Sequence, residues 1–239
     1  MIVAAAICPS PPLLAAELTG QADILPELRA ACAVALARLL AADPDVVAVV
    51  GPAEQTGAWD PAGELSLASF APALRAGDRQ PPLAVPSVPS VPSVPLALGI
   101  GALLLDDAGY TAPRILHGIA EHEPVADCLA FGREIAASAP RVALLAVGDG
   151  TARRSASAPG YLDERAAPFD ETVERAVREA DLTAIAALDP ALAASLLAVG
   201  RPAWQVLAGA VSAGRPQTEI LYSDAPFGVA YLVATFIPQ

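Results

Sequence analysis

The sequence predicts an α/β fold in which helices cover both faces of a central, mixed and mostly parallel sheet. Apolar runs without polar alternation, at residues 2–8, 46–50 and 141–147, are typical of strands that are buried on both faces. Segments with apolar residues at helical spacing separate these runs, which favours strand–helix–strand units with parallel strands. The 239 residues, 54% of them hydrophobic, suffice for one large core, and we find no linker that would divide residues 1–239.

The first strand–helix–strand unit opens the chain. Its first strand, residues 2–8, runs into the sequence CPSPPLL, where prolines prevent the strand from continuing. Residues 24–42 are expected to form a helix, because apolar side chains recur at helical spacing and Pro26 stands near the start. The second strand, residues 46–50, ends in a Gly-Pro turn.

Residues 51–95 are expected to be mostly loop, and they contain the repeat PSVPSVPSVP at residues 86–95. Proline at every third position favours polyproline II, so one interpretation is a Pro-rich docking motif. We favour a surface connector within a Pro-rich loop at residues 80–95. The repeat lacks the basic residue that usually orients such ligands, and loops tolerate insertions at small thermodynamic cost.

The rest of the chain is expected to continue the alternation of helices and strands. The expected helices are residues 96–108, 125–138, 169–180, 191–198 and 203–212. The expected strands are residues 114–118, 141–147, 219–222 and 229–236, the last two joined by SDAPFG. Gly99 and Gly101 form a GxG pattern, but no strand precedes them, so a phosphate-binding loop is not indicated.

The charge balance weighs against two classes of partner. All 14 basic residues are arginine, the formal net charge is −12, and the arginines form no stripe. Nucleic acids and anionic membrane surfaces are bound by basic side chains, so neither partner is expected. No apolar stretch reaches the roughly 18 to 20 residues that span a membrane, and the N-terminus does not resemble a signal peptide. We therefore expect a cytoplasmic protein.

Neither the cysteines nor the histidines form a recognisable motif. Cys8, Cys32 and Cys128 lie far apart in the sequence and match no disulfide framework or zinc site. His117 is expected in a strand, in a structural role. His122 is expected to begin a helix between two glutamates, and a structural role is favoured over a functional one. The sequence also lacks the HExxH and GxSxG patterns of zinc proteases and serine hydrolases.

Three strands are followed by short polar turns, with the sequences CPSPP, GPAEQTG and GDGTARRS. The carboxyl ends of parallel strands meet at one edge of a sheet, where α/β proteins bind ligands. We therefore expect the three turns to share one cleft. Its candidate residues are Ser10, Glu54, Gln55, Asp149, Thr151 and Arg153. The alternative is that Asp149 only caps a turn and that Glu54 is solvated.

Several motifs occur together in an order that resembles a known family. CPSPPLL resembles a family segment SPHPPLL, Gly51-Pro52-Ala53 stands where the family has SPH, and GDGTA, at residues 148–152, stands where it has GDLSH. A Trp-containing helix, WQVLAGAV, and the closing segment YSDAPFGV also match. The family is that of the class III extradiol ring-cleavage dioxygenases, subunit-B-like. The segment PGYLDERAAPFD is similar to an actinobacterial branch of it. The resemblance covers nearly the whole chain and implies the fold that the Memo proteins share.

Matched residue by residue, the resemblance implies that the iron site of the family has been lost. The two iron-ligand histidines fall on Ser10 and Ala53, the catalytic histidine falls near Ala152, and the carboxylate ligand falls near Gly200. His122 alone is a match for a further active-site histidine. Serine and alanine cannot replace imidazole as ligands. We therefore expect no cofactor, although the family uses Fe(II).

Two functions remain open. The first is a non-catalytic or repurposed relative that binds a small molecule in a pocket of Ser10, Glu54, Gln55, His122, Asp149, Thr151 and Trp204. The alternative is a divergent metal-dependent dioxygenase, or another enzyme, that uses Ser10, Glu54, His122 and Asp149. A less favoured interpretation is a subunit of a larger assembly, such as a homodimer, because relatives of this fold commonly dimerise or pair with a small subunit.

Overall fold

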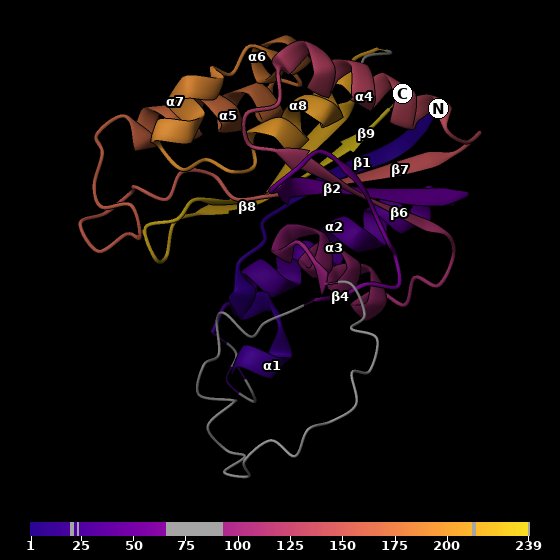
Figure 1. The fold of residues 1–239 in the computed structure, drawn as a ribbon, viewed down its shortest axis with the longest axis horizontal. Helices are drawn as coiled ribbons and strands as arrows, with labels where there is room; N and C mark the ends of the chain where they lie inside the picture. The colour runs from indigo at the N-terminus through magenta and orange to yellow at the C-terminus, as the bar shows by residue number, and fades with distance from the viewer. Residues whose placement is uncertain (20–21, 23, 66–92, 212–213, 239) are drawn as a thin grey trace.

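The computed structural model describes residues 1–19, 22, 24–65, 93–211 and 214–238. It confirms an α/β fold with a mixed, mostly parallel sheet between two layers of helices (Figure 1). Within the described residues the main sheet has seven strands, in the order β3-β6-β2-β7-β1-β9-β8. These strands are β1 (Ile2–Cys8), β2 (Val46–Ala53), β3 (Gly57–Trp59), β6 (Arg114–Ala120), β7 (Val142–Val147), β8 (Gln217–Asp224) and β9 (Tyr231–Ile237).

The central strands β6, β2, β7 and β1 are parallel, as their continuous apolar runs indicate. The register pairs Cys8 with Val147 and Ala53 with Ala120, so all four strands end along one edge of the sheet. We call this the carboxyl edge. Strand β9 runs antiparallel to β1, which brings its first residue, Tyr231, to the same edge. Polar residues that follow the parallel strands are therefore placed close together.

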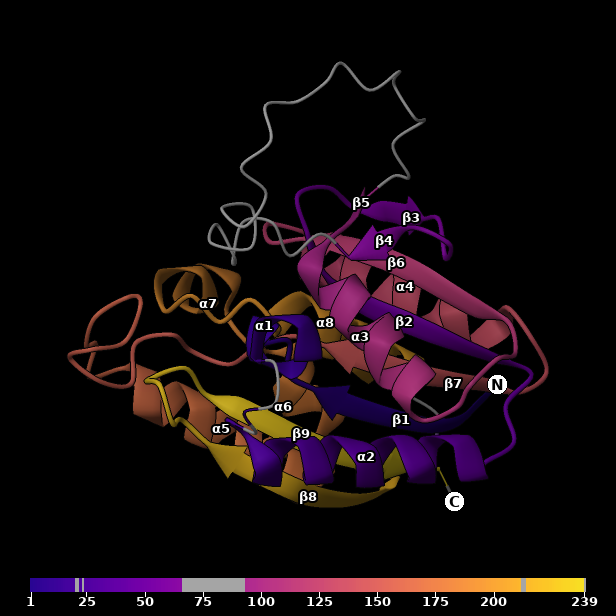
Figure 2. The same ribbon diagram turned by 90° about the horizontal axis from the view of Figure 1, so that it is seen from below.

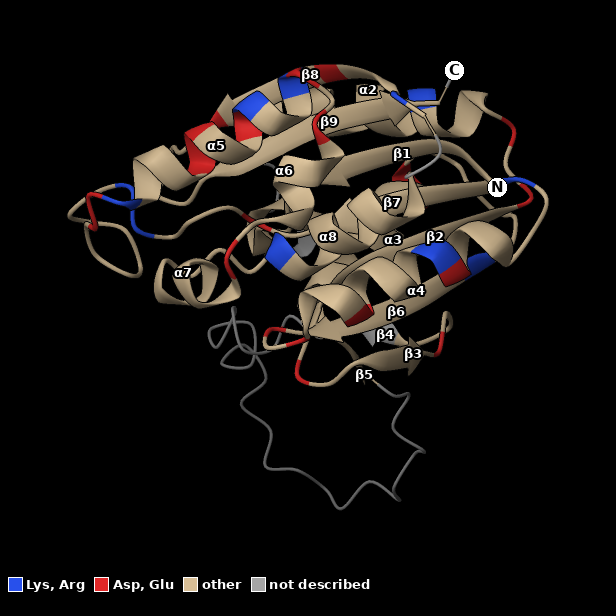
Figure 3. Cartoon of the chain, turned by 90° about the horizontal axis from the view of Figure 1, so that it is seen from above, with Lys and Arg blue, Asp and Glu red and all other residues tan. Residues whose placement is uncertain are grey.

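The helices divide between the two faces of the sheet. They are α1 (Ala16–Thr19), α2 (Pro26–Ala41), α3 (Leu96–Asp107), α4 (Val125–Ala137), α5 (Ala166–Arg178), α6 (Leu182–Ala186), α7 (Pro190–Ser195) and α8 (Arg201–Ala210). Helices α2 and α3 cover one face (Figure 2), and α4, α5, α6 and α8 cover the other. Acidic and basic residues both lie along α5 (Figure 3). No described helix is long and apolar enough to cross a membrane.

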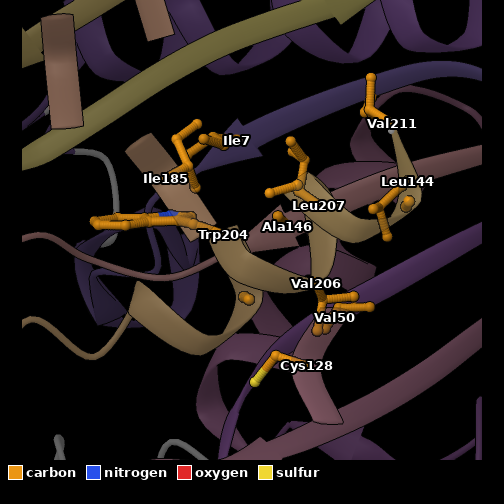
Figure 4. Packing of buried hydrophobic residues seen from close by; sticks show 14 of the residues in the cluster. Ile7, Val50, Cys128, Leu144, Ala146, Ile185, Trp204, Val206, Leu207 and Val211 are labelled. Carbon is orange, nitrogen blue, oxygen red and sulfur yellow. The ribbon is translucent and has the colours of Figure 1, made fainter. Parts of the chain in front are cut away.

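Each face of the sheet has its own hydrophobic core, because successive strand residues point to opposite faces. On one face, Trp204 and Leu207 of α8 pack over Ile7 and Ala146 of the sheet (Figure 4). On the other face, Ala4, Ala6 and Cys8 of β1 pack under α2 and α3. Helix α8 is buried along its whole length. Because it is packed on all sides, the residues at its start are held in fixed positions near the carboxyl edge.

Helices α4 and α8 pack so closely that side chains are excluded at their contact. A β-carbon added to Gly132 would lie 2.1 Å from the carbonyl oxygen of Val206, and one added to Gly209 would lie 2.3 Å from that of Leu129. Both distances are far inside van der Waals contact. The two glycines therefore fix how near α8 approaches α4.

The structure corrects one predicted site residue. His122 does not begin a helix: it lies exposed in the turn after β6, and α4 starts at Val125. Proline at position 124 explains the delay, because the residue before a proline is driven out of the helical region. Pro124 is itself extended, with φ −58° and ψ 141°. His117 lies in β6, as predicted.

The region predicted to be mostly loop contains more strand than expected. Strand β2 continues to Ala53, β3 follows it, and a two-stranded sheet is formed by β4 (Glu64–Leu65) and β5 (Ser93–Val94). Most of the Pro-rich loop and of the PSV repeat lies outside the described residues. Helix α6 was not predicted from the sequence; its N-cap is Asp181, whose carboxylate accepts a hydrogen bond from the N–H of Ala184.

Candidate functional site

Ser10 and Asp149 meet at the carboxyl edge. The pairing of Cys8 with Val147 brings the turns after β1 and β7 side by side. The N–H of Ser10 donates to Oδ1 of Asp149 at 2.6 Å, and its hydroxyl lies 3.5 Å from the same oxygen. Pro9, Pro11 and Pro12 have no N–H, so Ser10 carries the one backbone donor of this stiff turn. The prolines thus aim a single backbone donor at Asp149.

Asp149 is a carboxylate that titrates near neutral pH. Burial raises its pKa to about 6, and the two hydrogen bonds from Ser10 oppose this rise. The residue nevertheless remains partly accessible to solvent. Its charge also contributes to the raised pKa of Tyr231, after the larger effect of burial, which places Tyr231 within electrostatic reach. A partly accessible acid of this kind can exchange a proton or a hydrogen bond with a ligand.

The turn that carries Asp149 is held against the start of α8. Gly148 has φ +157°, and a β-carbon there would lie 2.6 Å from the Cα of Gly200. The N–H of Gly200 donates to the backbone carbonyl of Asp149 at 2.8 Å. A β-carbon on Gly200 would in turn lie 2.6 Å from the indole ring of Trp204. The glycines therefore allow Trp204, Gly200 and the Asp149 turn to stack without a gap.

Thr151 does not face the cleft in the way that the sequence suggested. It is fully buried, and its N–H and hydroxyl donate to the two carboxylate oxygens of Asp170, at 3.0 and 2.6 Å. Arg154 adds an ion pair to Asp170 at 3.0 Å. Burial raises the pKa of Asp170, and the bonds from Thr151 and Arg154 partly oppose that rise. Thr151 thus fixes Asp170, which sequence reasoning did not identify.

A cavity of about 220 Å³ lies beside this turn. Its lining residues are Gly150, Arg154, Asp170, Glu171, Val173, Glu174, Trp204, Ser223, Asp224, Ala225, Ala230, Tyr231 and Leu232. The predicted pocket residue Trp204 therefore does line a cavity. Its indole Nε1 is buried and has no hydrogen-bond partner among the described residues, so it retains an unused donor.

The remaining predicted residues stand apart from the Ser10–Asp149 pair. Glu54, Gln55 and His122 are exposed in the turns after β2 and β6. Among the described residues, no hydrogen bond or ion pair joins them to Ser10 or Asp149. The guanidinium of Arg153 donates to the carbonyl of Gly160 at 2.5 Å and so braces its own loop.

Two contacts that the sequence did not reveal hold the turn after β6. Thr56 donates a short hydrogen bond to Glu123 and accepts one from the N–H of Ala120 at 2.9 Å. Arg201, almost fully buried, donates to the carbonyls of Glu121 and Glu123 and to the side chain of Gln205. Apart from the bond between Arg201 and Gln205, these hydrogen bonds join residues far apart in the sequence, so no local pattern could have indicated them.

The residues at the positions matched to the family's iron ligands do not fit an Fe(II) site. Ser10, Ala53 and Gly200 offer neither imidazole nor carboxylate, which are the ligands that non-haem iron requires. Within the described part of the chain, no three His, Cys, Asp or Glu side chains gather so that they could hold a metal ion. Asp149 lies beside two of these positions, because it accepts hydrogen bonds from the N–H groups of Ser10 and Gly200.

Comparisons with known proteins identify the fold. No family model matches the sequence, and no curated protein matches it either. A solved structure described as that of the uncharacterized protein JW3007 from Escherichia coli K12 is similar over 98% of this chain and 99% of that chain. The TM-score is 0.56 and the sequence identity is 17%. At this identity the similarity shows a shared fold across the whole length of both chains.

Proposed function

We propose that the carboxyl edge binds a small organic molecule, with Asp149 and Ser10 as its polar contacts, and that it does so without the iron chemistry of the extradiol dioxygenases that the sequence resembles. The observation that carries this proposal is the placement of Asp149. It is a partly accessible carboxylate with a pKa of about 6, held by a proline-flanked donor at 2.6 Å. Gly150, the next residue, lines a cavity of about 220 Å³, and Ser10 and Asp149 lie beside that cavity without forming part of its wall.

The arrangement of the family-matched positions supports the same proposal. Ser10 contacts Asp149, and Gly200 donates its N–H to the backbone carbonyl of Asp149. Pro52, which precedes the matched Ala53, would lie 3.5 Å from a β-carbon on Gly148. Segments far apart in the sequence thus meet at the turn formed by Gly148 and Asp149. A scaffold that keeps this convergence but lacks the iron ligands is consistent with a pocket that changed its use.

The lining of the cavity indicates the charge of the ligand. Four carboxylates line it, those of Asp170, Glu171, Glu174 and Asp224, against one guanidinium, that of Arg154. An anionic ligand would be repelled by this balance, so a neutral or positively charged molecule is favoured. The aromatic rings of Trp204 and Tyr231 add apolar surface, which suits a ligand with a hydrophobic body.

The proposal is tested by thermal-shift screening of the purified protein against neutral phenols, catechols and aromatic amines. We expect at least one of these classes to raise the midpoint of unfolding, because a ligand that binds only the folded state stabilises it. The shift should be lost in Asp149→Asn and kept in the control Asp60→Asn, an exposed carboxylate that caps its own turn. A ligand whose shift is equal in both variants would refute the role of Asp149.

A second candidate function is acid–base catalysis by Asp149. The pKa of about 6 favours it, because general acids and bases work best when they titrate near the operating pH. The sequence alternative that also used Glu54 and His122 is less favoured, since both side chains are exposed and lack a described contact with Asp149. If turnover of a ligand from the screen survives Asp149→Ala but not His122→Ala, this assignment fails.

A further inference from the structure

The charges in the wall of the 220 Å³ cavity do not cancel one another. Arg154 is the cation among the described residues of this wall, and its guanidinium is already paired with the carboxylate of Asp170 at 3.0 Å. These two charges therefore neutralise each other. The wall has no other cation to pair with its remaining carboxylates, which are those of Glu171, Glu174 and Asp224.

Two of these carboxylates lack a cationic partner anywhere in the described part of the chain. Glu174 forms an ion pair at 3.2 Å with Arg178, which lies outside the wall. The carboxylate of Asp224 accepts a hydrogen bond from the N–H of Ala225 at 2.7 Å but forms no ion pair. Glu171 has neither a hydrogen bond nor an ion pair among the described residues. Negative charges from helix α5 and strand β8 thus border one cavity without being neutralised.

The same wall contains a buried donor that has no partner. Trp204 lines the cavity and is only 1% exposed, and its Nε1 has no hydrogen-bond partner among the described residues. A β-carbon on Gly200 would lie 2.7 Å from Cε2, the ring carbon bonded to Nε1. This edge of the indole therefore faces Gly200 and the adjoining turn, which continues into Gly150 of the wall. Buried donors are normally paired, so a ligand acceptor atom would supply what the fold leaves out.

The spacing of the carboxylates and the size of the cavity indicate which cation would fit. Within the described residues, no three His, Cys, Asp or Glu side chains gather closely enough to hold a metal ion. The wall also includes apolar surface from Val173 and Leu232 beside its aromatic rings. A cavity of about 150 Å³ can hold benzene, so 220 Å³ has room for one ring with a short chain.

We propose that this cavity binds an organic ammonium ion with a hydrophobic body, and that Glu171 and Asp224 supply its counter-charges. The inference rests on the proposed function of the carboxyl edge and names the class of its ligand. The ammonium group lies toward the carboxylates, where opposite charges attract. The hydrophobic body lies against the aromatic and aliphatic side chains of the wall. Selection by charge is thus assigned to two residues that the role of Asp149 does not involve.

The experiment is a calorimetric titration with three probes that share one body and differ in charge. The probes are 2-phenylethylamine, 2-phenylethanol and 3-phenylpropionate. We expect the amine to bind at least about 10-fold more tightly than the alcohol, which corresponds to about 1.4 kcal/mol. The carboxylate should bind most weakly, because the wall repels it. Added salt should weaken binding of the amine and leave binding of the alcohol unchanged.

A matched pair of double variants tests the assignment to residues. Glu171→Gln/Asp224→Asn should abolish the preference for the amine and leave the affinity for the alcohol as in the parent. The control is Asp60→Asn/Glu134→Gln, which removes the same charge from two exposed residues outside the wall. It should keep the preference. Circular dichroism checks that each variant is folded, and the single variants replace a double variant that is not.

The outcomes separate this inference from the proposed function. Equal affinities of the parent for the amine and the alcohol would overturn the inference, as would a preference that survives in Glu171→Gln/Asp224→Asn. Neither result would affect the role of Asp149. Failure of all three probes to bind would also overturn the inference, and the thermal-shift comparison with Asp149→Asn would then decide the proposed function separately.

Discussion

At the scale of single residues, the chemistry of the carboxyl edge depends on how Asp149 is placed. Its carboxylate accepts a hydrogen bond from the N–H of Ser10, and the residue is still partly accessible to solvent. Burial alone would favour the neutral acid, and the Ser10 bonds favour the anion. The balance leaves a group that can change its charge near neutral pH.

The raised pKa of Asp149 predicts a pH dependence of stability. The folded-state pKa of about 6 exceeds the ordinary value of 3.8, so the folded protein binds the proton more tightly. The stabilisation is complete below pH 3.8 and is lost as the pH rises through 6, with a total of at most about 3 kcal/mol. Urea unfolding of the parent and of Asp149→Asn between pH 4 and pH 8 measures it.

We expect the parent to lose stability relative to Asp149→Asn as the pH rises through this window. The pKa of Asp170 is also raised, so Asp170 changes stability with pH in the same direction. Both proteins contain Asp170, so its contribution cancels in the difference between them. Asp60→Asn serves as the exposed control. A difference in free energy of unfolding that stays constant with pH would show that Asp149 does not titrate in this range.

Arg201 is a second residue with a strong expected effect. Its buried guanidinium satisfies the carbonyls of Glu121 and Glu123, and replacement by methionine leaves these without their donor. We expect Arg201→Met to lower the free energy of unfolding by about 3 kcal/mol. This is the typical cost of leaving buried polar groups without their hydrogen-bond partner. Arg178→Met, which breaks an exposed pair with Glu174, should cost about 0.5 kcal/mol or less. Equal losses in denaturant unfolding would contradict this account of Arg201.

At the scale of elements, the contact between α4 and α8 determines where Trp204 and Gly200 stand. Helix α8 crosses beneath the carboxyl edge, and its approach to α4 is fixed by glycines on both helices. Any residue that separates the two helices should therefore move the start of α8 relative to the Asp149 turn. The packing of α4 against α8 and the geometry of the candidate site are therefore coupled through α8.

Gly132→Ala tests this coupling. The added methyl group would lie 2.1 Å from the carbonyl of Val206, so the helices must separate. Such overpacking typically costs about 1–3 kcal/mol. The matched control is Gly57→Ala, where a β-carbon meets nothing within 4 Å. Denaturant unfolding should show a loss in Gly132→Ala that is clearly larger than any change in Gly57→Ala; similar values would mean that the helix contact adapts freely.

The elements also show what the sequence could and could not indicate. Strands β1, β2 and β7 were predictable because a continuous apolar run has one stable place, between two layers of helices. The start of α4 at residue 125 was predicted correctly. His122 was wrongly expected to begin a helix, because Pro124 drives the residue before it out of the helical region. Ser10 and Asp149 could be predicted as candidate site residues because each follows the end of a predicted strand. Asp170 and Arg201 could not, since their partners are fixed only by the tertiary fold.

At the scale of the whole molecule, cavities lie on both sides of the sheet. The cavity beside the Asp149 turn lies toward α5 and α8, and the cavity beside Cys32 lies between α2 and α3. The first is rich in carboxylates and the second is mostly apolar. The shared fold with a solved structure across both chains supports this architecture, while the proposed ligand site depends on this chain's own side chains.

The central claim is that the carboxyl edge is a ligand site that does not use iron. The most direct measurement is an anaerobic calorimetric titration of the purified protein with Fe(II), followed by oxygen-uptake assays with catechols. We predict weak binding without a defined stoichiometry and no catechol-dependent oxygen uptake, because Ser10, Ala53 and Gly200 provide no suitable ligands. One tight Fe(II) site per chain, lost in Asp149→Asn and accompanied by oxygen uptake, would contradict the account.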